Sequence, residues 1–464
     1  MGQRRESEPR PAGPPLGVGT KLLLGTGDHA VNVTLSALSL VYVWYLAKVV
    51  GIAPGLAAAV PLVGRFVDAF TDPLMGRLSD RTRSRFGRRR PYFALGAIPF
   101  GLSFALLWVD PGLSGQWTLF AFYCGVYVFY SLASTVVSVP YVAVLPEIVP
   151  DFDERTSVNA YRSALTLLGT LLAATGTRPL AQWLGGPEPD FFLMGCAFGV
   201  WVTLPWLALF AAVRERGDWT APARRGWFDG LRLLWTHPDY LRLSGMYLSG
   251  RISMDLVGMM LLFFVGDWLG RPGDFEAVAG VFILSAVVVL PLWVRLAERT
   301  DKRRAFGYGC LWWGGTMLLF LIADSDFPPR WAAFALVAVS AGGYAVVDMM
   351  PWSMLADVVD EDELRSGERR EGIYSGFFTF TRKLGGATGV FLAGSVLQLA
   401  GYHDGPHPQP ESALQAVRWL TAVAPAVFLG IAVWSSRSYR LTRARHAEIV
   451  AELESRRTAA AEPA

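Results

Sequence analysis

The sequence predicts an all-α membrane protein with twelve transmembrane helices, arranged as two six-helix halves, and with both termini in the cytoplasm. Three observations carry this prediction: apolar stretches of membrane-spanning length recur along the chain, Lys and Arg gather in alternate loops, and short segments of the first half reappear in the second. Of the 464 residues, 52% are hydrophobic and 17% are charged. An average soluble domain carries about 25% charged residues.

The apolar stretches are the basis of the helix prediction. Uncharged runs extend over residues 92–109, 116–146, 191–213, 277–294, 305–323, 384–402 and 419–436. Each approaches or exceeds the roughly 18–20 residues that a helix needs to cross about 30 Å of hydrocarbon. Only helices and closed barrels satisfy their backbone groups in lipid, and these runs are too long and too continuously apolar for barrel strands.

Twelve spans result when helices interrupted by charges are included. Their predicted limits are residues 21–50, 54–79, 91–110, 116–147, 160–184, 190–213, 238–267, 275–296, 304–323, 329–358, 372–402 and 412–436. The chain then divides into a disordered cytoplasmic tail, an N-terminal half, a cytoplasmic middle loop, a C-terminal half and a cytoplasmic C-terminal tail, at residues 1–19, 20–213, 214–237, 238–436 and 437–464. Residues Trp227–Trp235 of the middle loop predict an amphipathic helix at the membrane interface.

Basic residues give the orientation of these spans. Arginine and lysine are concentrated after spans 2, 6 and 8, in residues 77–90, 214–225 and 295–304. The intervening loops, such as 51–53, 111–115 and 324–328, are short and poor in these residues. Because cytoplasmic loops carry the excess of Lys and Arg, the even-numbered loops and both termini are predicted to face the cytoplasm. These residues either set topology alone or also take part in gating.

Two features of the first half recur at the corresponding positions of the second half, which indicates a duplicated architecture. Arg77–Thr82 closes span 2 and the similar segment Arg295–Thr300 closes span 8, while acidic clusters follow spans 4 and 10. Basic and acidic loops on one face can pair and so latch one conformation. The predicted gating residues are Arg77, Asp80, Arg81, Arg85, Arg295, Glu298, Arg299, Asp357 and Asp360. Six spans plus six spans around a longer middle loop is the plan of the major facilitator superfamily.

Charged residues inside the spans indicate a solute transporter. They are Asp28, Arg65, Asp68, Asp72, Arg162, Arg251, Asp255, Asp348, Arg382 and Lys383. A charge at mid-membrane costs at least about 2.5–3.5 kcal/mol, and such residues usually face a cavity.

Asp68 and Asp72 are the predicted cation site. They are four residues apart on one helix face, where two carboxylates repel unless a cation or a proton lies between them. Thr71 and Thr135 supply further candidate oxygen ligands, and Pro73 frees a backbone carbonyl one turn back. The alternative is a purely structural salt bridge between Arg65 and Asp68.

The other intramembrane charges divide between substrate binding and structure. Arg162 and Lys383 lie in opposite halves, where a two-half transporter binds its substrate, although positions near the cytoplasmic ends are the alternative. Asp348 precedes a helix-breaking proline, and Trp352 could stack on a sugar ring or an acyl chain or simply pack against lipid. Arg251 and Asp255, also four apart, are predicted to neutralise each other inside the bundle.

Several function classes find no support in the residues. No Gly-x-x-x-x-Gly-Lys stretch is present, and the three cysteines show no metal or disulfide spacing, so we expect neither an enzyme nor a resident cofactor or metal site. The net charge of +3 gives no reason to expect nucleic acid. The expected partners are a small-molecule substrate, a coupling cation (sodium or proton) and membrane lipid, with the chain acting as a monomer.

The motifs together resemble the glycoside–pentoside–hexuronide:cation symporter family, the melibiose-permease-like branch of the major facilitator superfamily. The resemblance runs from Lys21 to about Arg440, and animal sodium–lysophosphatidylcholine symporters are distant relatives. Its most specific pieces are residues 65–76 with 82–88, residues 351–363 with 367–372, and residues 160–162.

The resemblance implies a role for each matching residue. Asp68 and Asp72 would bind sodium, lithium or a proton, with Thr71 in place of an asparagine and Thr135 in place of a span 4 threonine. Arg162 and Lys383 match cations of the polar cavity. Asn32 and Ser138 stand where the galactoside transporters keep sugar-binding aspartates, and neither accepts hydrogen bonds with a full charge. Both remain substrate-binding candidates, but melibiose-type galactosides are disfavoured.

The sequence therefore predicts an alternating-access symporter of a bacterial-type inner or plasma membrane that couples a cation to a sugar, a glycoside or a uronate. Three alternatives stay open. They are a proton-coupled exporter on the same fold, a transporter of lysolipids or other amphiphiles, and a membrane sensor without transport.

Overall fold

The computed structural model describes residues 16–148, 152–213, 237–324, 327–367, 371–403 and 408–461, and these residues form helices and connecting segments without any strand. In the N-terminal half they are α1 (Val18–Ala37), η1 (Leu38–Tyr42), α2 (Val43–Lys48), α3 (Pro54–Arg81), α4 (Arg90–Leu106), α5 (Gln116–Ile148), α6 (Phe152–Gly185) and α7 (Phe191–Ala212). The C-terminal half holds α9 (Pro238–Phe263), η2 (Phe264–Trp268), η3 (Pro272–Asp274), α10 (Phe275–Arg299), α11 (Lys302–Leu319), η4 (Phe320–Ile322), α12 (Arg330–Ser366), α13 (Glu371–Leu399) and α14 (Glu411–Ser438), followed by α15 (Arg443–Ala461).

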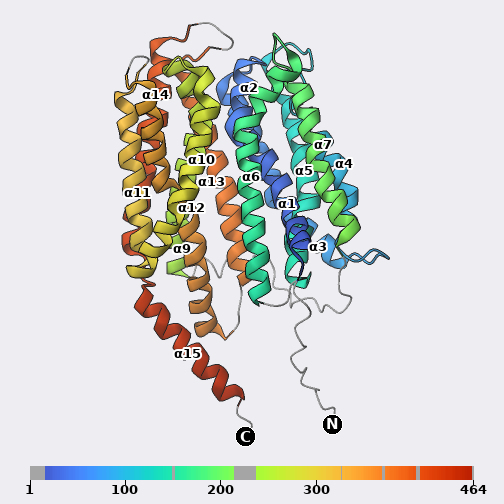
Figure 1. Cartoon of the computed structure of the whole chain (residues 1–464), viewed down its shortest axis with the longest axis vertical. Coiled ribbons are helices and arrows are strands. Elements are labelled where there is room, and N and C mark those ends of the chain that lie inside the picture. The colour runs from blue at the N-terminus through green and yellow to red at the C-terminus, as the bar shows by residue number, and fades with distance from the viewer. Residues whose placement is uncertain are drawn as a thin grey trace.

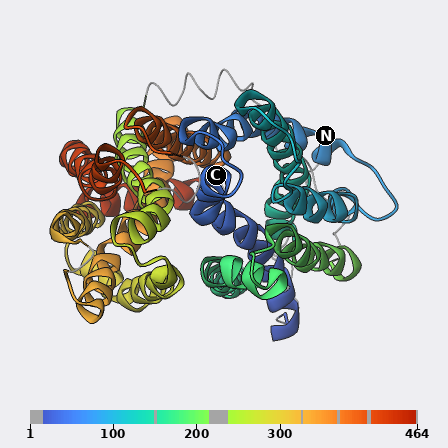
Figure 2. The ribbon, with the colours of Figure 1, turned by 90° about the horizontal axis from the view of Figure 1, so that it is seen from above.

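The two halves stand side by side as helical bundles (Figure 1), and Figure 2 shows them along the helix axes. Eight of the described helices are long and apolar enough to cross a membrane. Some of the other long helices before α15 are too short or too charged to be counted with these eight. For example, α4 has only 17 residues, and α3 and α13 carry clustered charges. In each half the first helix contains a π-helical turn, η1 and η2, a feature that often accompanies functional sites.

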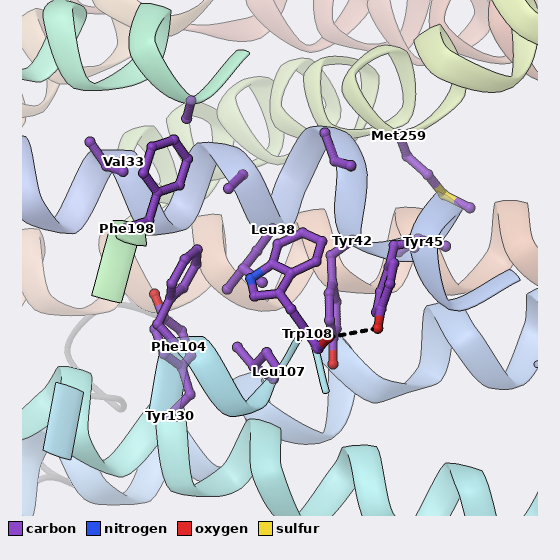
Figure 3. Packing of buried hydrophobic residues seen from close by; sticks show 14 of the residues in the cluster. Val33, Leu38, Tyr42, Tyr45, Phe104, Leu107, Trp108, Tyr130, Phe198 and Met259 are labelled. Atoms are coloured by element: carbon purple, nitrogen blue, oxygen red, sulfur yellow. Dashed lines mark hydrogen bonds between the residues drawn. The ribbon is translucent and has the colours of Figure 1, made fainter. Parts of the chain in front are cut away.

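Buried aromatic side chains hold the N-terminal half together at the end away from the termini (Figure 3). Tyr42, Tyr45 and Trp108 are each almost wholly buried, and Tyr45 donates its hydroxyl to the backbone oxygen of Trp108 at 2.9 Å. Met259 of α9 joins the same cluster from the other half. Apolar packing is therefore continuous across the two halves at this end.

Polar contacts also join the halves at the end away from the termini. Lys48 pairs with Asp267 at 3.1 Å, and Arg178 pairs with Glu276 at 3.0 Å. The backbone N–H of Gly55 donates to the side-chain oxygen of Gln398 at 3.1 Å. The bundle is thus closed at this end.

Closure at that end depends on Gly394 of α13, which lies directly against α3. A Cβ at this position would come closer than 3.0 Å to the Pro54 carbonyl oxygen and to the Ala58 Cβ. We therefore expect Gly394→Leu to shift the protein toward a conformation that is open at this end. Accessibility of an engineered cysteine near Gln398 to a membrane-impermeant thiol reagent should rise several-fold, whereas Gly430→Leu, at a glycine with open space around it, should leave it unchanged. Unchanged labelling in the Gly394 variant would contradict this role.

The C-terminal segment contains a helix, α15, that was not predicted from the sequence. Residues 437–464 were predicted to be a tail, but α15 packs against the end of α12 through the buried side chains of Ile449 and Leu453. The predicted N-terminal tail up to residue 15 and the predicted interfacial helix Trp227–Trp235 lie outside the described residues.

His237 caps the start of α9. Its Nδ1 accepts a hydrogen bond from the Tyr240 backbone N–H, which requires that this nitrogen carries no proton. Burial lowers the pKa of His237 and so favours the neutral ring.

Candidate functional site

Two carboxylates of α3 meet a lysine from the opposite half. Asp68 and Asp72 lie one turn apart on α3, and the Lys383 Nζ of α13 lies 2.6 Å from Asp72 Oδ2 and 3.4 Å from Asp68 Oδ2. The Asp68 side chain is 6% exposed and that of Asp72 is 28% exposed. A single ammonium group therefore occupies the place between two carboxylates that would otherwise repel each other.

Hydroxyl groups of α5 complete the surroundings of this pair. Thr135 donates to Asp72 Oδ1 at 2.7 Å, and Ser131, one turn earlier, donates to the carboxylate of Asp68. Thr71, by contrast, donates to the Val67 carbonyl of its own helix at 3.0 Å and does not contact the acids in this arrangement. Ser131 was not among the predicted ligands, although its spacing of four from Thr135 puts both hydroxyls on one face of α5.

Arg65 adds a second cation to the pair. Its Nη1 lies 3.1 Å from Asp68 Oδ2, so the salt bridge considered as a structural alternative is present together with the Lys383 contact. Pro73 lies inside α3 and has no N–H, which leaves the Ala69 carbonyl without its helical donor. Asp68 is thus bound by two cations and a hydroxyl, while Asp72 has one cation and one hydroxyl.

A cavity of about 460 Å³ lies between the halves beside this pair. This volume is within the range of small-molecule sites. One side is charged, with Arg65, Arg251, Asp255, Asp348, Arg382 and Lys383 from α3, α9, α12 and α13. The facing part of α6 and α10 is mostly apolar, with Leu167, Phe282, Ile283, Ala286, Val287 and Leu290. The cavity is therefore amphipathic.

The charged side contains a second cluster centred on Arg251. Arg251 binds Asp255 through two contacts of 2.5 and 3.0 Å and lies 3.7 Å from Asp348, whose side chain is 47% exposed. The pairing of Arg251 with Asp255 is as the spacing indicated, but both side chains line the cavity rather than only bracing the bundle. Gly386 of α13 faces this carboxylate with no room for a Cβ, so α13 and α9 lie in close contact.

Arg382 differs from the other cations of the cavity. It lines the cavity, yet its guanidinium group makes no hydrogen bond or ion pair with any other described residue. Together, the cavity and the acid pair hold four basic side chains (Arg65, Arg251, Arg382 and Lys383) and four acidic ones (Asp68, Asp72, Asp255 and Asp348). The charges balance in number, but Arg382 has no partner among the described residues.

The predicted substrate residues fall into two groups. Asn32, Asp348 and Lys383 line the cavity, whereas Arg162, Ser138 and Trp352 are not among its described lining residues. Arg162 is instead bound to Asp28 by contacts of 2.5 and 3.0 Å.

Trp352 also has partners away from the cavity. It donates its indole N–H to the Tyr247 hydroxyl at 3.0 Å and contacts the Phe378 ring edge-to-face. Local partners therefore account for both Arg162 and Trp352 in this conformation.

The predicted gating residues pair within their own halves or are exposed. Asp80 binds Arg89 at 2.8 Å, Asp357 binds Lys302 at 2.7 Å, and Asp360 contacts His446 of α15 at 3.1 Å. Those that are exposed at the end that carries the termini are Arg77, Arg81, Arg85, Arg295, Glu298 and Arg299. The predicted latch between a basic and an acidic loop is thus not formed among the described residues of this conformation.

Comparisons with known proteins agree with this architecture. Residues 23–443 match the MFS/sugar transport protein family. The chain is 30% identical to an uncharacterized symporter, sll1374, of Synechocystis, covering 94% of this chain and 96% of the relative. It is 29% identical to the inner membrane symporter YicJ of Escherichia coli, with coverage of 92% and 93%, and 28% identical to sodium-dependent lysophosphatidylcholine symporter 1-A of Danio rerio, with coverage of 93% and 87%.

A solved structure gives the same fold. A bacterial homolog of the human lysosomal transporter Spinster, in an inward-facing and unoccupied conformation, superimposes with a TM-score of 0.66 at 13% identity, over 91% of this chain and 97% of that one.

The family match and the relatives named as symporters, together with two packed helical halves around a charged central cavity, define an integral, multi-pass secondary transporter of the major facilitator superfamily. The chain belongs to the MFS/sugar transport protein family, as the match over residues 23–443 and the relatives named as symporters establish. The resemblance to the melibiose-permease-like branch is confirmed at this level.

Proposed function

We propose that the chain is a cation-coupled symporter that works by alternating access across a cell inner membrane, with twelve spans and both termini in the cytoplasm. The observation that carries the proposal is the contact of Lys383, in the C-terminal half, with Asp68 and Asp72 in the N-terminal half. The Lys383 side chain thereby links protonation of the acid pair, or binding of a cation to it, to the relative position of the two halves.

Competition for the acid pair supplies the coupling. A sodium ion or a proton that binds Asp68 and Asp72 removes the negative charge that holds the Lys383 ammonium group. The link between α3 and α13 at this depth is then lost, and Lys383 becomes available to the cavity. Cation binding thus changes both the balance between conformations and the charge that a substrate meets, so that each ligand raises the affinity for the other.

The contacts between the halves support an inward-facing state. Lys48–Asp267, Arg178–Glu276 and Gly55–Gln398 close the end away from the termini. With both termini in the cytoplasm, the cavity faces the cytoplasm. In the outward-facing state the exposed basic residues at the ends of α3 and α10 would come close to the acids of α12, and this is the role we assign to the predicted gating residues.

The substrate is a small organic solute, and a sugar, a glycoside or a uronate is our first candidate. The polar side chains of Arg251, Asp348 and Asn32, which all line the cavity, support this class, because hydroxyl groups need such donors and acceptors. A lysolipid or another amphiphile is the second candidate, favoured by the apolar wall of α6 and α10 and by the lysophosphatidylcholine symporter among the relatives.

Solute-driven cation movement tests the proposal. Proteoliposomes containing the purified chain receive a solute panel on the outside, and uptake of radioactive sodium and internal acidification are recorded in parallel. A symporter moves one of these cations inward only when its solute is added. Cation movement opposite to the solute would favour the exporter alternative, and solute flux without any cation movement would overturn the proposal.

A further inference from the structure

Arg382 carries a positive charge at the cavity for which the described neighbouring residues provide no ion pair. Arg382 is one of the residues that line the cavity, and its Nε is buried without a hydrogen-bond partner. Arg251, Asp348 and Arg65 are among the charged groups that act on it electrostatically, yet it forms no ion pair with any described residue.

The nearby acids are all bound to other cations. Asp68 and Asp72 share Lys383, and Asp255 is held by two contacts from Arg251. Asp348 also lies nearer to Arg251, at 3.7 Å, than to any other described basic group. Arg382 is therefore the basic group of the charged wall that forms no ion pair with a described acid, although the charges balance in number.

Arg382 is partly exposed, and its Nε is buried. A charge that is withdrawn from water without a partner is unfavourable unless water or a ligand satisfies it. A guanidinium group presents a planar fork of donors that matches the two oxygens of a carboxylate or a phosphate, and it is the side chain that proteins use for such groups. The charge, the free donors and the position in the cavity together favour an oxyanion as the missing partner.

We propose that Arg382 binds the anionic group of the transported solute, so that the substrate is an organic carboxylate or phosphate monoester whose remaining part lies toward α6 and α10. This inference rests on the proposed transport function. Arg382 acts in it as a specificity-determining binding residue, separate from the cation site at Asp68 and Asp72.

Charge balance connects this site to the coupling cation. Four basic and four acidic groups surround the cavity and the acid pair, so one added cation leaves a surplus of one positive charge. An anionic solute at Arg382 restores the balance, and Lys383, once released from the acid pair, lies on the same helix to assist. A neutral glycoside would leave the surplus charge uncompensated.

Matched ligand pairs test the proposal on the full chain in lipid nanodiscs. Binding of glucuronate is compared with binding of glucose, and binding of lysophosphatidate with binding of monoacylglycerol, each without sodium at neutral pH, at saturating sodium, and at low pH. Each pair differs essentially in its anionic group. We expect the wild-type chain to prefer the anionic member of at least one pair by about 10–100-fold, the range expected for hydrogen bonds between charged groups.

The variants then assign that preference to the side chain. Arg382→Gln should remove most of the 10–100-fold preference and change the affinity for the neutral member less than about threefold. Arg382→Lys should retain an intermediate preference, because it keeps the positive charge but lacks the planar fork of donors of a guanidinium group. Arg330→Gln serves as the control, because Arg330 is exposed, pairs with Asp274 and is not among the described residues that line the cavity. Thermal unfolding of each variant checks that the fold is retained.

Three outcomes would overturn the inference. They are a wild-type chain that binds no anionic probe, an Arg382→Gln variant that keeps the full preference, and an equal loss of affinity for both members of a pair. The carboxylate and phosphate arms separate a uronate from a lysolipid. Anion preference without any cation stimulation in the wild-type chain would count against the symport proposal and leave the Arg382 site intact.

Discussion

Replacing Asp72 by Asn is expected to abolish cation-driven accumulation of solute. Asparagine has nearly the same shape and keeps an acceptor oxygen for Thr135, but it removes one of the two charges that bind Lys383 or the coupling cation. The coupling between cation and solute, typically about 5–150-fold in affinity, should then disappear. Solute should still equilibrate across the membrane, because the cavity itself is unchanged.

The measurement is the ratio of internal to external solute in proteoliposomes under an imposed sodium or proton gradient. Asp72→Asn should bring this ratio to one. Asp110→Asn, in an exposed loop at the end away from the termini, is the matched control and should accumulate solute like the wild type. If Asp72→Asn or the equivalent Asp68→Asn still accumulates solute, then the acid pair is not the cation site.

The second large effect is expected for Lys383→Gln. Without the ammonium group, Asp68 and Asp72 face each other across a gap that only a cation or a proton can fill, while Arg65 binds Asp68 alone. We expect the apparent affinity for the coupling cation to rise about tenfold or more, since its competitor is gone, and the thermal stability in cation-free buffer to fall. Concentrative transport should be lost, because the acid pair no longer communicates with α13.

A double variant separates this mechanism from simple misfolding. Combining Lys383→Gln with Asp72→Asn removes one charge of each sign, so stability without cation should recover toward the wild-type value, a non-additive result typical of residues in direct contact. Cation titrations followed by thermal unfolding report both quantities. An unchanged cation affinity in Lys383→Gln would show that lysine and cation do not compete.

The helices and the acid pair could be read from the sequence because both depend on local patterns. Apolar runs of membrane-spanning length fix where helices lie, and a spacing of four puts Asp68 and Asp72 on one face. Thr135 was placed beside them by family resemblance, and its hydroxyl does contact Asp72. The same spacing of four residues could have predicted Ser131, which lies one turn before Thr135 on α5 and contacts Asp68.

What the sequence could not provide were contacts between distant segments. Lys383 is 311 residues from Asp72 along the chain, and no periodicity relates them. Arg162 was expected at the substrate, but Asp28, one turn before Asn32 on α1, binds it instead. That Arg382 has no partner among the described residues likewise follows only from how the neighbouring cations share the acids, which is a property of the folded bundle.

The predicted latch between loops illustrates a different limit. Charge signs at the ends of α3, α10 and α12 show that pairing is feasible, but which pairs form depends on the conformation. With the halves joined at the end away from the termini, Asp80, Asp357 and Asp360 find partners in their own halves. The sequence indicates both arrangements and cannot choose between them.

Infrared difference spectroscopy of the carboxylates tests the central claim most directly, because it responds to a bound metal cation as well as to a bound proton. Spectra of the purified chain in lipid are recorded before and after addition of sodium, and before and after acidification. We predict a carboxylate difference signal in the wild-type chain that is absent from the Asp68→Asn, Asp72→Asn double variant. The same signal in both proteins would mean that the cation binds elsewhere and would contradict the account.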